Sequence, residues 1–141
     1  KEEIETLKTV RREEYQERKW TWWMKIMTTI AQENVRKIHD AGGILVAGTD
    51  QTTGPALHRE LELLADAGIT PVDIIRIATL NGAVFLGLEK DLGSIEEGKK
   101  ADLVLLSADP SLDIRNAGQV THVIKNGMLI DRSKLVLPIN Q

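Results

Sequence analysis

The sequence predicts an α/β fold, and three observations support this prediction. Residues 43–50 are apolar at odd and even positions and end in Thr49 and Asp50, which is typical of a strand covered on both faces. On either side of this run, apolar residues recur three and four positions apart, which predicts helices. Beyond residue 90, short apolar runs separated by turn residues predict a small antiparallel sheet. We therefore expect one unit in residues 1–90 and a second in residues 91–141.

Size and composition limit the classes of protein to which the chain can belong. Its 141 residues, 42% of them hydrophobic, suit one globular domain but are too few for a closed eight-stranded α/β barrel of about 250 residues. The net charge of -3 argues against nucleic acid and anionic membranes as partners. The absence of cysteine excludes disulfides and thiolate metal sites. No apolar stretch approaches the ~20 residues that span a bilayer, and we expect a cytoplasmic location.

The first predicted helix covers residues 1–41, which contain neither proline nor glycine. From residue 20 an apolar stripe runs along one face of it, formed by Trp20, Trp23, Met24, Met27, Ile30, Ala31, Val35 and Ile38. We expect this stripe to pack in the core. A lid or a subunit contact is the alternative, since Trp22 falls off the stripe and all three tryptophans lie within residues 20–23. Gly42 and Gly43 are expected to end the helix.

Two more helices are predicted after the apolar run. The first opens at Pro55, and its expected inward face is Leu57, Leu61, Leu64 and Ala65. The second has a strong start signal, with Thr70 as the cap and Pro71 at the first helical position. Its expected inward face is Val72, Ile75, Ala78 and Thr79. Residues 81–82 (Asn-Gly) should interrupt this helix, and a short further turn should end at Gly87.

Three strands are predicted in the last third of the chain, over residues 101–106, 120–125 and 128–130. Asn126 and Gly127 separate the last two, and both residue types tolerate positive φ. This pair predicts a β-hairpin with a two-residue turn.

Asp50 is the first candidate functional residue. In parallel α/β sheets and barrels, ligands collect at the carboxyl ends of the strands, where Asp50 would lie. The alternative is that Asp50 caps a turn or the next helix. Its position alone leaves both interpretations open.

Five motifs, in order along the chain, carry a family resemblance. They are residues 47–50 (AGTD), 57–61 (LHREL), 67–71 (AGITP), 78–83 (ATLNGA) and 92–104 (LGSIEEGKKADLV). Together they resemble the metal-dependent amidohydrolase superfamily, in particular its prolidase-like and imidazolonepropionase-like branch, from about residue 33 to residue 131.

The resemblance implies a fold and a function. Residues 1–90 would be the last helix, strand and helices of a (β/α)8 (TIM) barrel, with residues 44–49 as its eighth strand. Residues 91–141 would be the C-terminal part of a composite β-sandwich. Asp50 would be a metal ligand and proton shuttle, and the enzyme would hydrolyse amide, peptide or cyclic amide C–N bonds by metal-activated water. The implied cofactor is a divalent metal, expected to be zinc, as one or two ions.

The departures from the family pattern are large. Its His-x-His motif, its bridging lysine or glutamate and its two further histidines are absent. We expect His39 and His122 to be structural. For His58 a substrate-side role and a surface or capping role both stay open. The metal would therefore need ligands from a missing N-terminal portion, and we expect the isolated chain to be inactive.

The expected partners follow from this interpretation. They are the N-terminal portion of the same enzyme and a small-molecule or peptide substrate, and a homo-oligomer stays open. The alternative function is a non-catalytic interaction or assembly chain that contacts a partner through the tryptophan-bearing helix.

Overall fold

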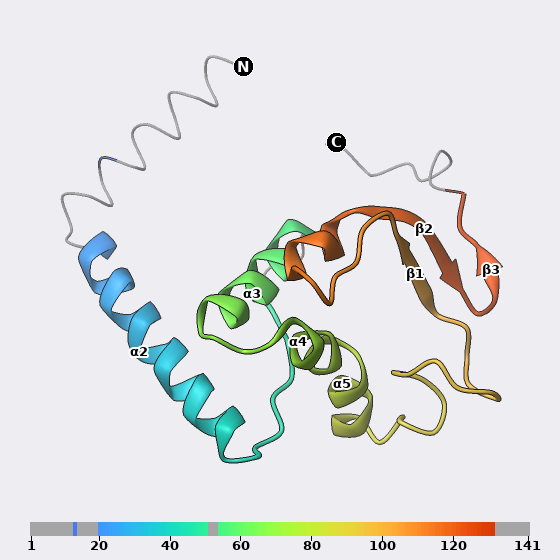
Figure 1. Ribbon diagram of the computed structural model, residues 1–141, viewed down its shortest axis with the longest axis horizontal. Helices are drawn as coiled ribbons and strands as arrows, with labels where there is room; N and C mark the ends of the chain where they lie inside the picture. Colours follow the sequence, from blue (N-terminus) through green and yellow to red (C-terminus); the bar gives the residue numbers. More distant parts are fainter. Residues whose placement is uncertain (1–12, 14–19, 51–53, 132–141) are drawn as a thin grey trace.

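The computed structural model describes residues 13, 20–50 and 54–131 (Figure 1). Helix α2 lies at the left of Figure 1, helices α3–α5 lie in the middle, and the strands lie at the right. The elements are α2 (Trp20–Asp40), α3 (Gly54–Asp66), α4 (Pro71–Ala78), α5 (Leu80–Phe85), β1 (Leu103–Leu106), the 3₁₀ helix η1 (Ile114–Gly118), β2 (Val120–Lys125) and β3 (Met128–Leu129).

Helix α2 ends as the glycine signal predicts. Gly42 has φ +79°, its N–H donates to His39 O at 2.9 Å, and the Gly43 N–H donates to Ile38 O at 2.9 Å. This pair of bonds satisfies carbonyls that the helix end would otherwise leave unpaired. Residues 1–12 and 14–19 of the predicted first helix lie outside the described residues. Among the described helices, none combines the length and the apolar character that crossing a membrane requires.

Most of the described side chains of the apolar stripe of α2 do not pack in the core, so that expectation is wrong for them. Trp23, Met24, Met27, Ile30 and Ile38 are each 45–57% exposed. A neighbouring face of helix α2 meets α3 and the turn after it instead. Gln32 Nε2 donates to Leu63 O of α3 at 3.2 Å, and Arg36 Nη1 donates to Gly68 O of the turn at 2.7 Å. Within the stripe, Val35 packs against the buried cluster.

Helices α3, α4 and η1 build the core. Its buried members are Leu61, Leu64, Ile69, Ile74, Ile77 and Ile114. The predicted start of α4 is confirmed, since the Thr70 hydroxyl accepts from the Asp73 N–H at 3.3 Å and Pro71 opens the helix. The 3₁₀ helix η1 had no sequence signal that we recognised, and it carries Ile114 into the core.

The predicted inward faces of α3 and α4 need correction. Val72 is 61% exposed, whereas Ile74 is fully buried and Ile77 is 3% exposed. Helix α4 contains apolar residues on both faces, so the direction from which α3 and η1 approach decides which face is buried. On α3, Leu61 and Leu64 are buried as expected, but Leu57 is 42% exposed.

Residues 43–49 were expected to form a strand, and this expectation is also wrong for the described part of the chain. They pair with no described strand. Two hydrogen bonds tie their backbone to helices instead, from Ala47 N–H to Ile77 O at 3.4 Å and from Asn81 Nδ2 to Leu45 O at 2.8 Å. The reason is that a parallel strand needs strands beside it to complete its hydrogen-bond ladder.

Strands β1, β2 and β3 form an antiparallel sheet in chain order. The predicted hairpin is confirmed, with Asn126 at φ 50° and Gly127 at φ 77° between β2 and β3. Asp102 accepts from the Asn126 N–H at 2.7 Å and pairs with Lys125, and the Lys125 bond is the main reason that the pKa of Asp102 is lowered. The composite β-sandwich stays a prediction, as does the division near residue 90.

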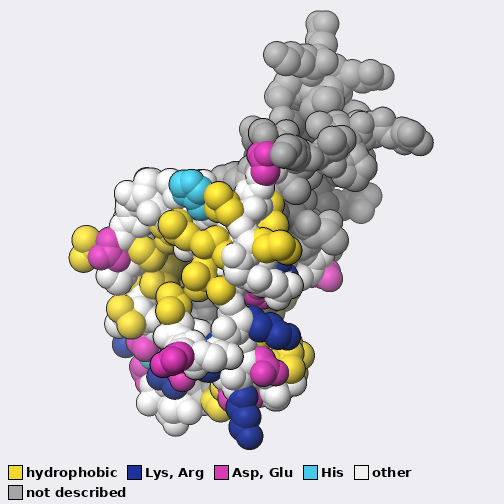
Figure 2. Space-filling view, turned by 90° about the vertical axis from the view of Figure 1, so that its right-hand side faces the viewer, with side chains coloured by type: hydrophobic (Ala, Val, Ile, Leu, Met, Phe, Trp, Pro, Cys, Tyr) yellow, Lys and Arg dark blue, Asp and Glu magenta, His cyan; other side chains and the backbone are white. Residues whose placement is uncertain are grey.

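Apolar side chains of the sheet lie at the surface. Val104, Leu105, Met128 and Leu129 are 43–68% exposed. Figure 2 shows hydrophobic side chains gathered around a hollow on the side of the molecule that faces right in Figure 1.

Candidate functional site

Asp50 lies exposed at the end of the extended segment that precedes α3. Along this segment Leu45 and Ala47 are half-buried and pack against the core, whereas Ile44 is 68% and Val46 43% exposed. Side chains of an extended backbone alternate between two sides with a period of two residues. The alternation covers residues 44–48 only, because Thr49 and Asp50 are both exposed and the chain bends at Asp50. Asp50 is therefore accessible to a ligand at the end of this segment.

The described residues do not provide a complete metal site. They contain no group of three or more His, Cys, Asp or Glu side chains close enough to hold a metal ion. A catalytic zinc typically has three protein ligands and a water. Asp50 would therefore fit such a site only as one ligand among others that this part of the chain does not supply.

The three histidines lie in different places. His122 is exposed on β2, where it pairs with Leu105 of β1. His58 is half-buried on α3 and faces η1, since a Cβ placed on Gly118 would lie 4.0 Å from His58 Nδ1. This contact gives His58 a packing role, and its substrate-side role stays a prediction.

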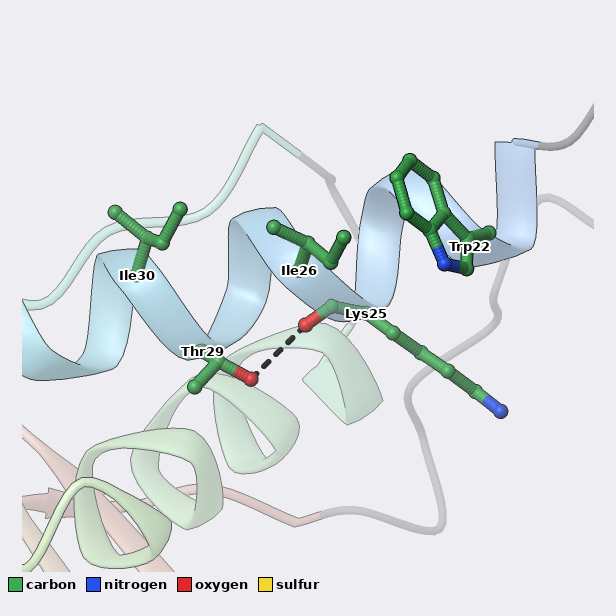
Figure 3. A pocket seen from close by; sticks show the side chains of 5 residues that line it. All are labelled: Trp22, Lys25, Ile26, Thr29 and Ile30. Carbon is green, nitrogen blue, oxygen red and sulfur yellow. Dashed lines mark hydrogen bonds between the residues drawn. The ribbon is translucent and has the colours of Figure 1, made fainter.

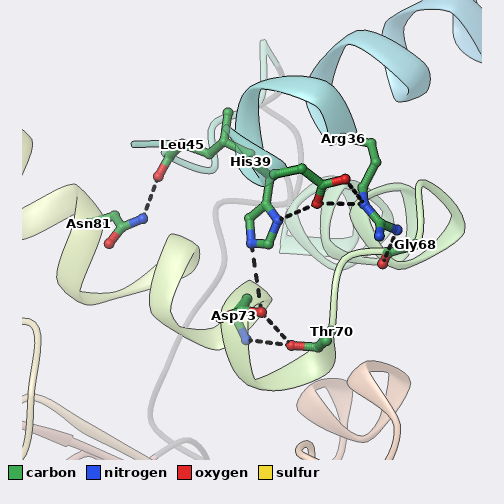
Figure 4. A network of polar contacts seen from close by, with 8 residues as sticks. Arg36, His39, Leu45, Gly68, Thr70, Asp73 and Asn81 are labelled. Atoms are coloured by element: carbon green, nitrogen blue, oxygen red, sulfur yellow. Dashed lines mark hydrogen bonds and ion pairs between the residues drawn. The ribbon is translucent and has the colours of Figure 1, made fainter. Parts of the chain in front are cut away.

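His39 belongs to a polar network that joins the end of α2 to the start of α4 (Figure 4). Its Nδ1 lies 3.4 Å from Asp40 Oδ1, and its Nε2 lies 3.7 Å from Asp73 Oδ2. Arg36 Nε donates to both Asp40 oxygens at 2.8 Å, and this bond is the main cause of the lowered pKa of Asp40. These contacts join the two helices through His39, and its structural role stays a prediction.

Asn81 is a site-related residue to which the sequence analysis gave no role. Its side-chain amide donates to Leu45 O, in the segment that leads to Asp50 (Figure 4). The motif 78–83 contains Asn81, but the sequence indicated only a break in a helix. The signal was missed because the partner lies 36 residues away along the chain.

A shallow groove follows one side of α2 (Figure 3). Its lining residues are Trp22, Lys25, Ile26, Thr29 and Ile30, and Trp22, Ile26 and Ile30 project from the same side of the helix in Figure 3. Trp22 and Trp23 also contact each other edge to face, with 5.7 Å between ring centroids. The lining contains no carboxylate or histidine, so the groove itself lacks the groups that hydrolytic chemistry uses.

Comparison with known proteins places the chain in a family. Residues 28–130 match the profile described as Amidohydrolase family. An imidazolonepropionase from Geobacillus sp. (strain WCH70) is 34% identical over 116 residues, which cover 77% of this chain and 27% of that protein. The crystal structure of a Xaa-Pro dipeptidase with bound methionine in the active site is similar with a TM-score of 0.66 and 33% identity, covering 70% of this chain and 25% of that one. An amidohydrolase from Thermotoga maritima MSB8 has a TM-score of 0.60 and 31% identity over 72% of this chain and 26% of its own.

These similarities extend over most of this chain but over about a quarter of each of those proteins. The described residues thus form an α/β piece of the fold that those structures share. Asp50, His58 and Asn81 all lie inside the matched range. Since that range covers more than half of the sequence, and similarity in sequence agrees with similarity in structure, the chain belongs to the amidohydrolase family.

Proposed function

We propose that this chain is the C-terminal portion of a metal-dependent amidohydrolase that hydrolyses an amide, peptide or cyclic amide C–N bond. In the complete enzyme, neighbouring strands complete the hydrogen-bond ladder that residues 44–49 lack here, so residues 1–90 form the last helix, strand and helices of a (β/α)8 barrel. Residues 91–141 contribute to a composite β-sandwich. The observation that carries the proposal is Asp50. It lies within the matched range 28–130 and is exposed at the end of the segment that precedes α3.

Asp50 supplies the chemistry that this chain contributes. A carboxylate can serve as a metal ligand and can take a proton from water and deliver it to a leaving nitrogen. A divalent metal, which we expect to be zinc, would supply activated water when bound. The other ligands come from the N-terminal portion, and so does most of the pocket that selects the substrate.

Replacing Asp50 by asparagine in the complete enzyme tests the proposal. The variant Asp50→Asn keeps the size of the side chain but removes the basic oxygen. We expect kcat to fall by about 10²–10⁴-fold, the usual contribution of general acid–base catalysis. The matched control is Asp66→Asn at the exposed end of α3, which removes the same charge and should turn over normally. Normal turnover of Asp50→Asn would remove Asp50 from the mechanism.

Metal content distinguishes the isolated chain from the complete enzyme. We expect the purified 141-residue chain to retain zinc at well below one ion per chain, because a single carboxylate does not hold a catalytic zinc. The complete enzyme should retain one or two ions. Elemental analysis after desalting measures both, and tightly bound stoichiometric zinc in the isolated chain would contradict the proposal.

A second candidate function rests on α2. Trp22, Trp23 and Met24 are 55–59% exposed in one stretch of this helix, a composition typical of contact surfaces. In this alternative the chain is a non-catalytic interaction or assembly chain. A coding sequence ahead of Lys1 that contains a His-x-His pair would favour the enzyme, and its absence would favour the interaction chain.

A further inference from the structure

We propose that Asn81 is a positioning residue: it fixes residues 45–47 against α4 and α5 and thereby sets where the segment that ends in Asp50 lies. This inference rests on the proposed function of Asp50. Asn81 belongs to the motif 78–83, and the proposed hydrolytic chemistry gives it no role.

The first step of the argument is the geometry of the hydrogen bond. Asn81 Nδ2 donates to Leu45 O at 2.8 Å, a distance inside the usual range for N–H···O bonds, and the bond is partly buried. The bond from the Ala47 N–H to Ile77 O is longer, at 3.4 Å, beyond that range. Of these two ties between the segment and the helices, the Asn81 bond is therefore the stronger.

The second step is that Asn81 is carried on a firmly packed element. Ala83 of α5 is 2% exposed, and a Cβ placed on Gly93 would lie 2.6 Å from the Ala83 Cβ. The loop after α5 thus packs against this helix with no space between them. A Cβ on Gly82 would lie 3.9 Å from Val46 Cγ1, so α5 also lies beside the extended segment. The amide of Asn81 is therefore held at a fixed place, and its hydrogen bond fixes the position of the Leu45 carbonyl.

The third step is the consequence for Asp50. A slip of one residue in an extended segment moves every side chain to the opposite side. The half-buried Leu45 and Ala47 would then face outward, and Asp50 would shift with the backbone that carries it. Burial of two small or medium apolar side chains is a weak guide to register, whereas a hydrogen bond to one carbonyl specifies a single register. Asp50 lies five residues beyond Leu45, about 16 Å along an extended chain, so Asn81 acts on it through the backbone.

The test compares Asn81→Asp with Asn34→Asp. The first replaces an amide donor by an acceptor of nearly the same shape beside the Leu45 carbonyl, and the second makes the same change at an exposed position of α2. In the 141-residue chain we expect the Ala47 amide to exchange with solvent about tenfold faster in Asn81→Asp, the factor that loss of one net hydrogen bond gives. Amides of the β1–β2 ladder should keep their exchange rates in both variants.

The second readout is turnover of the complete enzyme. We expect Asn81→Asp to lower kcat by about 10–100-fold, as misplacement of a reacting group by about 1 Å does, with KM nearly unchanged. Asn34→Asp should match the unmodified enzyme. Unchanged exchange at Ala47 in Asn81→Asp, faster exchange throughout the molecule, or an Ala47 amide unprotected even in the unmodified chain would each overturn the inference.

The outcomes for Asp50 and Asn81 are separable. If Asp50→Asn turns over normally, the proposed function fails whatever Asn81 does. If Asp50→Asn is inactive while Asn81→Asp keeps both its exchange protection and its kcat, the positioning role alone fails.

Discussion

Two glycines near Asn81 show how much a single Cβ can matter in this chain. Gly93 has φ +93°, and an added Cβ would lie 2.6 Å from the Ala83 Cβ and 3.1 Å from the Leu80 Cα. Gly82 lies inside α5, where an added Cβ would make an ordinary contact of 3.9 Å with Val46 Cγ1. The same substitution should therefore have opposite effects at the two positions.

We predict that Gly93→Ala destabilises the chain by about 1–3 kcal/mol, because it combines a strained backbone with a steric overlap. Gly82→Ala should be neutral or stabilising by up to about 1 kcal/mol, since alanine favours helix more than glycine does. Urea unfolding followed by circular dichroism measures both changes. Equal effects of the two substitutions would show that α5 and the loop at Gly93 do not pack as described.

At the scale of one element, α4 combines a local signal with a face chosen by its neighbours. Thr70 and Pro71 start the helix through contacts within a few residues, which the sequence contains. The buried face is Ile74 and Ile77, because α3 and η1 approach from that direction. The alternative face at Val72 is just as apolar, so periodicity in the sequence could not decide between them.

Truncation of each face tests this orientation. Ile74→Ala should cost about 2–5 kcal/mol of unfolding free energy, because it leaves a cavity in the core. Val72→Ala should change that free energy by less than about 0.5 kcal/mol, as substitutions at exposed positions do. The reverse order would mean that α4 buries the face containing Val72, as its sequence first suggested.

At the scale of the whole molecule, large apolar surfaces lie uncovered by the described residues. They include the α2 side chains Trp22 and Trp23 and the sheet residues Val104, Leu105, Met128 and Leu129, all at least 43% exposed. Exposed apolar patches of this kind mark interaction sites. In the proposed enzyme, the N-terminal portion of the same protein covers them.

Tryptophan fluorescence directly tests whether the N-terminal portion covers the exposed side chains of α2. Adding the separately produced N-terminal portion to the 141-residue chain should shift the emission of Trp22 and Trp23 to shorter wavelength, because their rings leave water. The double variant Trp22→Phe, Trp23→Phe should largely lose that shift and serves as the control. Binding without any shift would show that α2 is not part of the contact.

The sequence by itself determined the features whose causes lie within a few residues. These are the glycine end of α2, the Thr70 cap and the Asn126–Gly127 hairpin. Each depends on local hydrogen bonds or on a backbone conformation that few residue types adopt. Local sequence was enough for them.

Only the tertiary structure decided which faces are buried, where η1 lies and what holds residues 43–49. It turned the apolar stripe of α2 outward, buried Ile74 instead of Val72 and joined Asn81 to Leu45 across 36 residues of sequence. The physical reason is that burial and ladder pairing depend on which distant segments are present to make contact. The pattern of one segment shows which side chains it can bury and which hydrogen bonds it can form. Its neighbours in space determine which of these contacts are made.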